Sequence, residues 1–400
     1  MMDTLIISDE KSLPLAAGIL RGGGLTAVPT ETVYGLCANG LDAGAVAALY
    51  EVKGRPEVKP LSLMIPGPED MDKYARDIPD AARALAERFW PGPLTIILPA
   101  VESIPSVTLA GGKTVGLRCP DHPLTLALLR LTGFPLAGPS ANPSGQPSPK
   151  TAAQVLSYFD GKIGAVVDGG PCGIGKESTI LDMTALPWHI VRQGALSEET
   201  LDDALVENMT VYGLSGGSGS GKTTVLEYLT QRGALGLDCD AIYHELLEKD
   251  EDMLGELRRA FPDAFLSGSF DRKALGRIVF ADEALLNRLN EITHRYVVRE
   301  VRSRLRRHAR NGGTKAVIDA VALIESGLGE LCDLTVGVTA DADVRVRRIM
   351  EREGISEEYA RARIDAQHDD GFFETNCGAV IRNNGTLEEL QARCRELFGE

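Results

Sequence analysis

The sequence predicts two α/β domains, one in each half of the chain. Its 400 residues are more than a single hydrophobic core usually organises. The first half mixes apolar runs with Gly- and Pro-rich turns, which favours a mixed sheet with a few helices, and the second half alternates short strands with helices. A helical segment at 196–205, with Ser197 as its N-cap, is followed at once by an apolar run at 210–214. We therefore expect one domain over 1–206 and another over 207–400.

Both halves of the chain are acidic. Residues 1–206 carry 16 Lys and Arg against 23 Asp and Glu, and residues 207–400 carry 26 against 34. Proteins that coat nucleic acid constitutively are basic, so the composition argues against that class. Any binding of anions must depend on local clusters of positive charge.

The cysteines and the N-terminal segment indicate the compartment. No two cysteines have the spacing of zinc ligands or of a redox motif, and their number is odd, which argues against a metal site and a disulfide framework. The N-terminus lacks a basic stretch followed by an apolar run, and no window approaches the roughly 18 apolar residues of a membrane span. We expect a cytoplasmic protein that does not bind a membrane. The seven cysteines are Cys37, Cys119, Cys172, Cys239, Cys332, Cys377 and Cys394.

A glycine-rich run in the second half has the form of a P-loop. It follows the apolar run at 210–214 and precedes a helical run at 225–229, which is the context that the motif requires. Glycines let backbone N–H groups turn toward phosphates, and the next helix presents its positive end. Lys222 would reach the β- and γ-phosphates, and the Thr223 hydroxyl would bind Mg²⁺. The predicted ATP-binding residues here are Gly217, Ser218, Gly219, Ser220, Gly221, Lys222, Thr223 and Thr224.

Acidic residues follow two further predicted strands of this half. Asp238 and Asp240 come after the strand at 235–237, and Asp319 comes after the strand at 316–318. Ligands bind at the carboxyl ends of strands in open α/β sheets, so one acid can act as general base on an acceptor hydroxyl and another can bind Mg²⁺ or its water. An N-cap role for the first pair, before a helix at 241–248, is the alternative. Because guanine-specificity motifs are absent, the sequence favours a small-molecule kinase.

In this half, residues 210–400 resemble the dephospho-CoA kinase family. The resemblance implies a P-loop NTPase α/β/α fold with a parallel sheet and a helical lid, and transfer of the ATP γ-phosphate to the ribose 3′-hydroxyl of dephospho-CoA. It assigns Asp240 as the base, and places Arg352 and Arg363 on the lid over the phosphates. The motifs that carry it are 214–224, 238–240, 271–275, 278–280, Thr293-His294, 323–326, Arg352, Arg363, Gln367 and 380–385.

The second half departs from the family pattern at three places. Arg295 stands where the family usually has proline, Val321-Ala322-Leu323 replaces Pro-Leu-Leu, and the segment 368–371 lacks a basic residue often found there. These departures bear on affinity for the CoA side more than on ATP binding. They leave open a second interpretation, in which this half is a nucleotide-binding regulator. A basic run at 302–310 on a predicted helix is either a solvated face or a patch for phosphates or RNA.

The first half has no P-loop, but it carries polar and basic residues in unusual places. The strand-to-turn segment 28–36 is polar where a core strand would be apolar, and a helix at 43–52 leads into Lys53-Gly54-Arg55-Pro56, where two cations would project from one bend. The loop 138–145 carries hydroxyl and amide donors between prolines, which suits a preorganised binding loop or an ordinary turn. The further polar residues on or beside strands are Arg118, Ser178 and Arg192.

Together these runs resemble the YrdC family of threonylcarbamoyl-AMP synthases over about 13–201. The shared motifs are Lys53 with Arg55, Ser140 with Asn142, and the Pro-Thr-Glu-Thr-Val-Tyr-Gly-Leu segment at 29–36. The resemblance implies a mixed, twisted sheet with helices. It also implies condensation of L-threonine, bicarbonate and ATP to threonylcarbamoyl-adenylate with release of diphosphate, a product used in the t⁶A modification of tRNA.

The resemblance also distributes roles among these residues. Lys53 and Arg55 would neutralise the charge that gathers as a carbamate oxygen attacks the α-phosphorus, while other side chains fix the phosphates and the threonine. With no nucleophile or base triad, catalysis would rest on positioning and electrostatics. Mg²⁺ would accompany ATP. The remaining assigned residues are Thr30 for threonine, Ser140, Asn142 and Ser178 for phosphate geometry, and Arg118 and Arg192 for the triphosphate.

We therefore expect a bifunctional enzyme that acts on ATP, L-threonine, bicarbonate and dephospho-CoA. Contacts with tRNA or with proteins of the t⁶A pathway are further expected partners. The alternative from another class makes the first half a non-catalytic module that binds RNA, including double-stranded RNA, through its cationic cleft, joined to a P-loop kinase or a nucleotide-sensing domain.

Overall fold

The structure is a computed structural model that describes residues 3–54, 59–266 and 269–399. The chain divides into two compact units, Met1–Asn208 with Arg310–Gly312, and Met209–Ala309 with Gly313–Glu400. The division after residue 208 falls close to the boundary expected at 206. Helix α7 (Glu198–Glu207) begins after its N-cap Ser197, whose hydroxyl accepts from the Thr200 N–H, as the sequence predicted.

In the described part of the first unit, the strands form a mixed ten-stranded sheet in the order β1-β8-β2-β3-β7-β4-β6-β5-β9-β10. The sheet contains both parallel pairs, such as β4 with β6, and antiparallel pairs, such as β5 with β6. The strands are β1 (Leu5–Ile7), β2 (Thr26–Val28), β3 (Gly35–Asn39), β4 (Ser62–Met64), β5 (Leu94–Pro99), β6 (Thr114–Arg118), β7 (Leu136–Ala137), β8 (Ala165–Val167), β9 (Thr179–Asp182) and β10 (His189–Arg192). The helices are α1 (Leu13–Arg21), α2 (Ala43–Lys53), α3 (Met71–Tyr74), α4 (Asp80–Phe89), α5 (Pro123–Thr132), α6 (Ala152–Phe159) and α7.

Helices α1 and α5 cover the core of this unit. The buried residues of α1 recur at helical spacing, at Leu13, Ala16, Ala17 and Leu20, so one face of the helix is apolar. This face packs with Leu128 and other apolar residues of α5 and of the sheet. The buried stripe holds the sheet in place and leaves the loops at the strand ends available for a site.

Helix α2 ends at the bend that the sequence singled out. Asp42 caps its N-terminus by accepting from the N–H groups of Gly44 and Ala45, and Gly54 ends it in the left-handed conformation at φ 57°. Lys53 is the last helical residue and is only 3% exposed. The expectation that two cations project together from this bend is therefore wrong for Lys53, which points into the fold, and Arg55 lies outside the described residues.

The second unit contains a parallel sheet whose described strands run in the order β12-β13-β11-β14-β15. The predicted strands at 210–214, 235–237 and 316–318 are all present, each slightly longer. The strands are β11 (Thr210–Ser215), β12 (Leu235–Asp238), β13 (Lys315–Asp319), β14 (Leu334–Thr339) and β15 (Ala379–Arg382). The helices are α8 (Lys222–Thr230), α9 (Cys239–Lys249), α10 (Glu251–Ala260), α11 (Arg272–Val279), α12 (Glu283–Arg310), α13 (Ala342–Glu353), α14 (Glu357–Asp365), α15 (Asp370–Asn376) and α16 (Leu387–Phe398).

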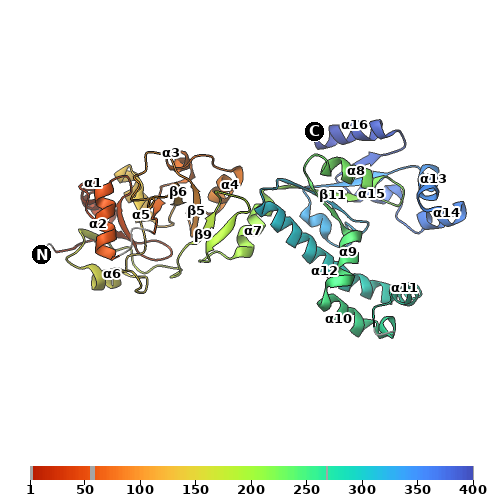
Figure 1. The fold of residues 1–400 in the computed structure, drawn as a ribbon, viewed down its shortest axis with the longest axis horizontal. Coiled ribbons are helices and arrows are strands. Elements are labelled where there is room, and N and C mark those ends of the chain that lie inside the picture. Colours follow the sequence, from red (N-terminus) through yellow and green to blue (C-terminus); the bar gives the residue numbers. More distant parts are fainter. Residues whose placement is uncertain (1–2, 55–58, 267–268, 400) are drawn as a thin grey trace. The chain divides into compact units, whose positions relative to one another are not determined.

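Helices flank this sheet and extend beyond it. The sheet and helices α8 and α16 enclose a core that includes Leu214, Val225, Val338 and Phe398. Helices α10 and α11 lie together to one side of the sheet, and α13 and α14 form a separate helical pair (Figure 1). The α13–α14 pair has its own small core around Val346, Ile349, Ala360 and Ile364. This pair is the helical lid implied by the resemblance in the sequence.

The basic run at 302–310 lies on α12. Arg304 pairs with Glu245 at 2.8 Å and with Glu300 at 2.8 Å, and Arg310 pairs with Asp202 at 2.5 Å. At these two positions the positive charge is compensated by acids, which favours a charged surface face over a patch for phosphates or RNA.

Candidate active sites

The loop between β11 and α8 has the geometry of a phosphate cradle. β11 is the central strand of the sheet, and its last residue, Ser215, leads directly into the glycine-rich run. Gly216, Gly219 and Gly221 adopt positive φ angles of 150°, 77° and 104°, which residues with a Cβ rarely adopt. α8 begins at Lys222 directly after the loop, so the positive end of the helix lies beside it, although the Thr224 N–H already donates to the Gly221 carbonyl at 3.1 Å.

Lys222 is folded back over this loop. Its Nζ donates to the carbonyl oxygen of Gly216 at 2.6 Å. Burial lowers the pKa of Lys222, and the carboxylates of Asp319 and Asp240 partly oppose that change by favouring its charged form. Thr223 and Thr224 follow Lys222 in the first turn of α8, as the P-loop pattern predicted.

The acids at the strand ends lie side by side. Asp238 ends β12 and Asp319 ends β13, and the two are register partners in the parallel sheet. Burial raises the pKa of Asp319 to about 6, with repulsion from Asp238 and Asp240 adding to the rise and Lys222 opposing it. Asp238 is the N-cap of α9 and accepts from the N–H groups of Asp240 and Ala241, so the capping alternative is confirmed for Asp238.

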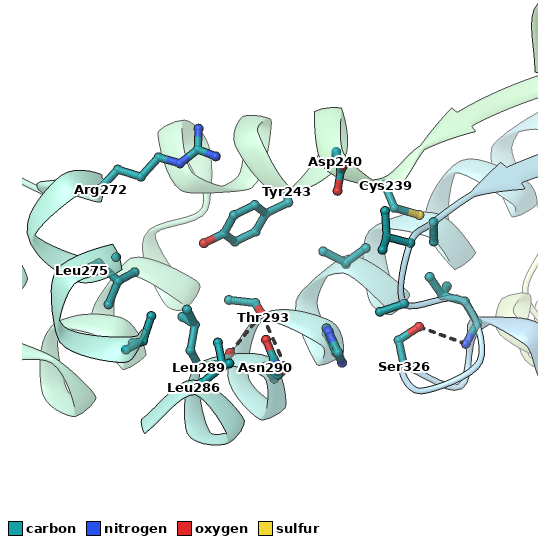
Figure 2. A pocket seen from close by; sticks show the side chains of 18 of the residues that line it. Cys239, Asp240, Tyr243, Arg272, Leu275, Leu286, Leu289, Asn290, Thr293 and Ser326 are labelled. Carbon is teal, nitrogen blue, oxygen red and sulfur yellow. Dashed lines mark hydrogen bonds between the residues drawn. The ribbon is translucent and has the colours of Figure 1, made fainter. Parts of the chain in front are cut away.

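Asp240 has a different position, in the first turn of α9, where it lines a cavity of about 580 Å³ (Figure 2). Asp240, Tyr243 and Arg272 lie along one wall and face Asn290 and Thr293 of α12. The remaining lining is largely apolar. It includes Leu275, Val279, Phe280, Leu286, Leu289, Val297 and Leu328. A molecule with an apolar arm could lie in this cavity and place a hydroxyl group beside Asp240.

One of the sequence departures borders this cavity, and Arg295 lies outside its lining. Val321 and Ala322 line it directly, while Arg295 pairs with Glu256 and lies over the ring of Tyr296 at 5.3 Å. Val321 is 48% exposed at the cavity mouth. Of the departures, Val321 and Ala322 therefore lie in the wall of the cavity that Asp240 also lines.

Sequence reasoning missed two arginines of α13 that contact the P-loop. Arg345 donates to the Ser218 carbonyl at 2.9 Å, and Arg348 donates to the Gly219 carbonyl at 3.3 Å. No local motif marks either residue, because both contacts join residues more than a hundred positions apart. The predicted Arg352 lies one turn further along α13 and pairs with Glu353 at 2.6 Å, and Arg363 of α14 pairs with the same carboxylate at 2.7 Å.

The first unit contains a second, smaller cavity of about 170 Å³. It lies among the loops at the ends of β2, β4, β6 and β9 and is lined by both hydroxyl groups and charged side chains. Of the predicted residues it gathers Thr30, Arg118, Ser140, Ser178 and Arg192.

Arg118 occupies the buried end of this cavity. It forms an ion pair with Glu31 at 2.8 Å, and the two side chains are 9% and 11% exposed. Its Nη2 also donates to the Thr32 hydroxyl at 2.7 Å, while its buried Nε has no hydrogen-bond partner among the described residues. Thr30 is fixed nearby, because its hydroxyl donates to the Val33 carbonyl at 2.6 Å. Sequence reasoning missed Glu31 as the counter-ion, although it lies within the 29–36 motif.

Arg192 and Ser178 form another part of the cavity lining. Arg192 donates to the Ser178 carbonyl at 2.8 Å and to its hydroxyl at 3.0 Å. The same hydroxyl lies 2.8 Å from that of Thr95. Ser178, which directly precedes β9, thus holds the guanidinium of Arg192 at the edge of the cavity, where it can bind an anion.

Lys53 supports the loop that carries Ser140 and Asn142. Its ammonium group donates to the backbone carbonyls of both residues. Ser140 reaches the cavity, but the Asn142 amide donates within its own loop, to Pro143 at 3.0 Å and Gln146 at 2.7 Å. Asn142 therefore shapes the loop, and the structure does not bring its side chain to the cavity lining.

The residues present fit a magnesium ion at the P-loop. Thr223 provides a hydroxyl, and Asp319 provides a carboxylate whose charge interacts with that of Lys222. Mg²⁺ characteristically takes one or two carboxylates and completes its shell with phosphates and water. Within residues 3–54, 59–266 and 269–399, no group of three or more His, Cys, Asp or Glu could hold a metal ion. None of the described helices is long and apolar enough to cross a membrane.

The second unit thus has the architecture of a P-loop kinase, and the first is an α/β domain with a polar, cationic cleft. A family model described as "Telomere recombination" (Sua5/YciO/YrdC) matches residues 18–194, and one described as "Dephospho-CoA kinase" matches residues 210–389. The first half is 46% identical over 210 residues to a threonylcarbamoyl-AMP synthase of Pyrococcus abyssi, covering 52% of this chain and 62% of that protein. The second half is 37% identical over 194 residues to a dephospho-CoA kinase of Corynebacterium glutamicum, covering 48% of this chain and 100% of the kinase.

Solved structures agree with the first assignment. The crystal structure of P. abyssi Sua5 complexed with L-threonine aligns with a TM-score of 0.50 and 37% identity, over 59% of this chain and 79% of that one. The chain spans less than two thirds of the synthases of P. abyssi (62%) and Bacillus subtilis (57%). The chain belongs to both families: it is a fusion of a YrdC/Sua5 domain with a dephospho-CoA kinase domain.

Proposed function

We propose that the protein is a bifunctional enzyme, a threonylcarbamoyl-AMP synthase in its first half and a dephospho-CoA kinase in its second. The observation that carries the kinase proposal is the position of Asp240, which lies in an apolar cavity and also interacts electrostatically with the P-loop lysine, Lys222. An acceptor hydroxyl beside Asp240 is therefore close to the place where a nucleotide γ-phosphate would lie.

In the kinase reaction, Asp240 accepts the proton of the ribose 3′-hydroxyl as its oxygen attacks the γ-phosphorus, and ADP leaves. Lys222 and the N–H groups of the P-loop stabilise the phosphate charge. Thr223 and Asp319 would hold Mg²⁺, and the ion would supply positive charge that offsets the charge of the phosphates. The apolar wall of the cavity suits the pantetheine arm of dephospho-CoA, and Arg272 suits its phosphates.

In the synthase reaction, the threonine amine and bicarbonate form a carbamate with loss of water. A carbamate oxygen then attacks the α-phosphorus of ATP, diphosphate leaves and the mixed anhydride forms. Three anionic groups meet in this step, so the role of Arg118, Arg192 and Lys53 is to offset their repulsion. Thr30, Ser140 and Ser178 position the substrates by hydrogen bonds, and the rate depends on that positioning.

Membership in the two enzyme families favours this proposal over an RNA-binding module joined to a nucleotide sensor. The proposal extends to Mg²⁺ at both sites, bicarbonate as the source of the carbamoyl carbon, and the cytoplasm as the location. It also includes transfer of the adenylate product to the proteins that modify tRNA.

The test is product analysis by mass spectrometry on the purified full chain. With threonine, bicarbonate and ATP we expect threonylcarbamoyl-adenylate and diphosphate, and with dephospho-CoA and ATP we expect CoA and ADP. Omission of threonine or bicarbonate is the control for the first reaction. Diphosphate release that is independent of both would overturn the synthase proposal, and an inert second half with intact ATP affinity would favour the regulator.

A further inference from the structure

The P-loop carbonyl groups are held on their outer side by side chains that the kinase reaction above does not use. Arg345 Nε donates to the Ser218 carbonyl at 2.9 Å, and Asn383 Nδ2 donates to the Ser220 carbonyl at 2.8 Å. Both residues are buried, at 5% and 6% exposed. The two contacts approach the loop from separate elements, α13 and the segment after β15.

These contacts determine where the next N–H groups point. In a trans peptide the C=O of one residue and the N–H of the next lie in one plane and point in opposite directions. A Ser218 carbonyl fixed toward Arg345 therefore turns the Gly219 N–H away from Arg345. In the same way Asn383 orients the N–H of Gly221. Oriented N–H groups of this kind form an anion-binding concavity.

Arg345 also fixes a second partner of the loop. Its Nη2 donates to Gln367 Oε1 at 2.9 Å, and the same oxygen accepts the Ser218 N–H at 2.8 Å. Gln367 Nε2 completes the contact by donating to the Ser218 hydroxyl at 3.0 Å. A Cβ at Gly217 would collide with the guanidinium, so the loop and Arg345 are closely fitted.

The charge of Arg345 has no ion-pair partner. Its hydrogen-bond acceptors are the neutral oxygens of Ser218 and Gln367, and no carboxylate of the described residues forms an ion pair with it, although Asp370 is near enough to favour its charged form. A buried cation without a counter-ion is costly. A phosphate group in the P-loop would supply the missing negative charge.

We propose that Arg345 is a positioning residue for the nucleotide phosphates: it orients the P-loop N–H groups through Ser218 and Gln367, and it supplies positive charge from behind the loop. This inference rests on one part of the proposed function, namely that the P-loop binds a nucleoside di- or triphosphate. It does not depend on which acceptor receives the phosphate.

The test is the affinity of the full chain for ADP with Mg²⁺, measured by calorimetry in the absence of acceptor. Arg345→Met removes the charge and both hydrogen bonds, and we expect ADP to bind about ten- to a hundredfold more weakly, the usual effect of lost hydrogen bonds to a charged group. Arg345→Lys retains the charge, but a lysine cannot donate to Ser218 and Gln367 with the planar geometry of the guanidinium. Its ADP affinity should therefore lie between those of Arg345→Met and wild type. Arg347→Met is the matched control, because Arg347 is exposed on the same helix.

Wild-type ADP affinity in both Arg345 variants would overturn the proposal, and so would an equal loss in Arg347→Met. Full rescue by Lys would overturn the orienting role. If Arg345→Met unfolds the second unit, the Lys variant decides the matter. The synthase reaction of the first unit, measured in the same samples, controls for protein quality. A wild-type protein that binds ADP but does not phosphorylate dephospho-CoA would contradict the proposed function and leave this inference standing.

Discussion

The ammonium group of Lys222 donates to the carbonyl of Gly216, six residues before it, at 2.6 Å. The contact closes the P-loop on itself and keeps the lysine at the place where phosphates would bind. The same side chain is half-buried, and this burial lowers its pKa, so a nearby anion would stabilise its charged form. When ATP binds, charged phosphate oxygens would replace the neutral Gly216 carbonyl as the acceptor of the Lys222 ammonium group, and its hydrogen bond would be stronger.

The first prediction concerns the independence of the two units. Lys222→Ala should lower kinase turnover by about a hundredfold or more, as the loss of a single transition-state donor typically does. Diphosphate release by the first unit should stay at the wild-type rate, because no residue of its cavity belongs to the second unit. Both activities are measured on one sample by separating ADP, CoA and diphosphate. Loss of both in a folded variant would contradict the independence.

The second prediction concerns pH and Asp319. Burial raises the pKa of Asp319 to about 6 from 3.8, so the folded state holds this proton more tightly than the unfolded chain. Below about pH 4 the Asp319 carboxyl group is protonated in both the folded and the unfolded state. Between pH 4 and 6 the free energy of unfolding falls as the pH rises. Above pH 6 the carboxylate is charged in both states, and the folded protein is less stable by up to about 3 kcal/mol than it is below pH 4. Asp319→Asn should therefore raise the melting temperature of the second unit at pH 7 but not at pH 4.

Calorimetry at both pH values measures this effect, and the kinase assay gives the second readout. We expect the same variant to lose activity with Mg²⁺ because it lacks the carboxylate. Asp263→Asn is a control, since Asp263 is an exposed carboxylate of the same unit. If Asp319→Asn is no more stable than wild type at pH 7, the charge of the Asp319 carboxylate does not destabilise the folded state.

Local features were predictable from the sequence, and distant contacts were not. The P-loop, its flanking elements and the Ser197 cap depend on residues within a few positions of one another, so their spacing alone predicts them. The link of Arg345 to Ser218 joins residues 127 positions apart, and that of Asn383 to Ser220 joins residues 163 apart. No pattern in a single sequence carries such pairs.

The environment of Lys53, at the end of α2, could not be predicted from the sequence for the same reason. Spacing places a lysine at a helix end, where a side chain ordinarily reaches solvent, but the backbone carbonyls of Ser140 and Asn142 accept hydrogen bonds from its ammonium group. Because burial there depends on a loop about ninety residues away, the sequence predicts the residue but not its environment. Asp238 is the converse case: its capping role is local, and it was among the alternatives that residue type predicted.

The third prediction concerns the buried pair of Glu31 and Arg118. Glu31→Ala should cost about 3–5 kcal/mol, because it leaves the guanidinium without a counter-ion in a buried site. The Asp121 N–H, which donates to Glu31 at 3.0 Å, would also lose its acceptor. Both tryptophans, Trp90 and Trp188, lie in the first unit, so fluorescence during urea unfolding reports on that unit alone.

Glu102→Ala is the control for this measurement, because Glu102 is exposed in the same unit. Added ATP should recover part of the lost stability if Arg118 meets the triphosphate, since a ligand that binds only the folded state stabilises it. A Glu31→Ala protein with the wild-type urea midpoint would show that the pair is not important for stability.

The fourth prediction concerns Arg272 and the residue that orients it. The Nδ1 of His244 lies 2.6 Å from the Asp240 carbonyl, so this nitrogen carries the proton, and Nε2 is left to accept from Arg272. The histidine thereby connects the backbone of Asp240 with the side chain of Arg272, and both of these residues line the cavity. Arg272→Met should raise the KM for dephospho-CoA about tenfold, because a charge-assisted contact to phosphate is lost.

Affinity for ADP should not change in Arg272→Met, because Arg272 lines the acceptor cavity and makes no hydrogen bond with the P-loop in the part of the chain that the structure describes. His244→Ala should give a smaller rise in the same KM, since it removes the orientation of Arg272 but retains its charge. Arg277→Met, an exposed position on the same helix α11, is the matched control. If the KM for ATP rises as much as that for dephospho-CoA, Arg272 acts on the nucleotide and the acceptor cavity must be assigned differently.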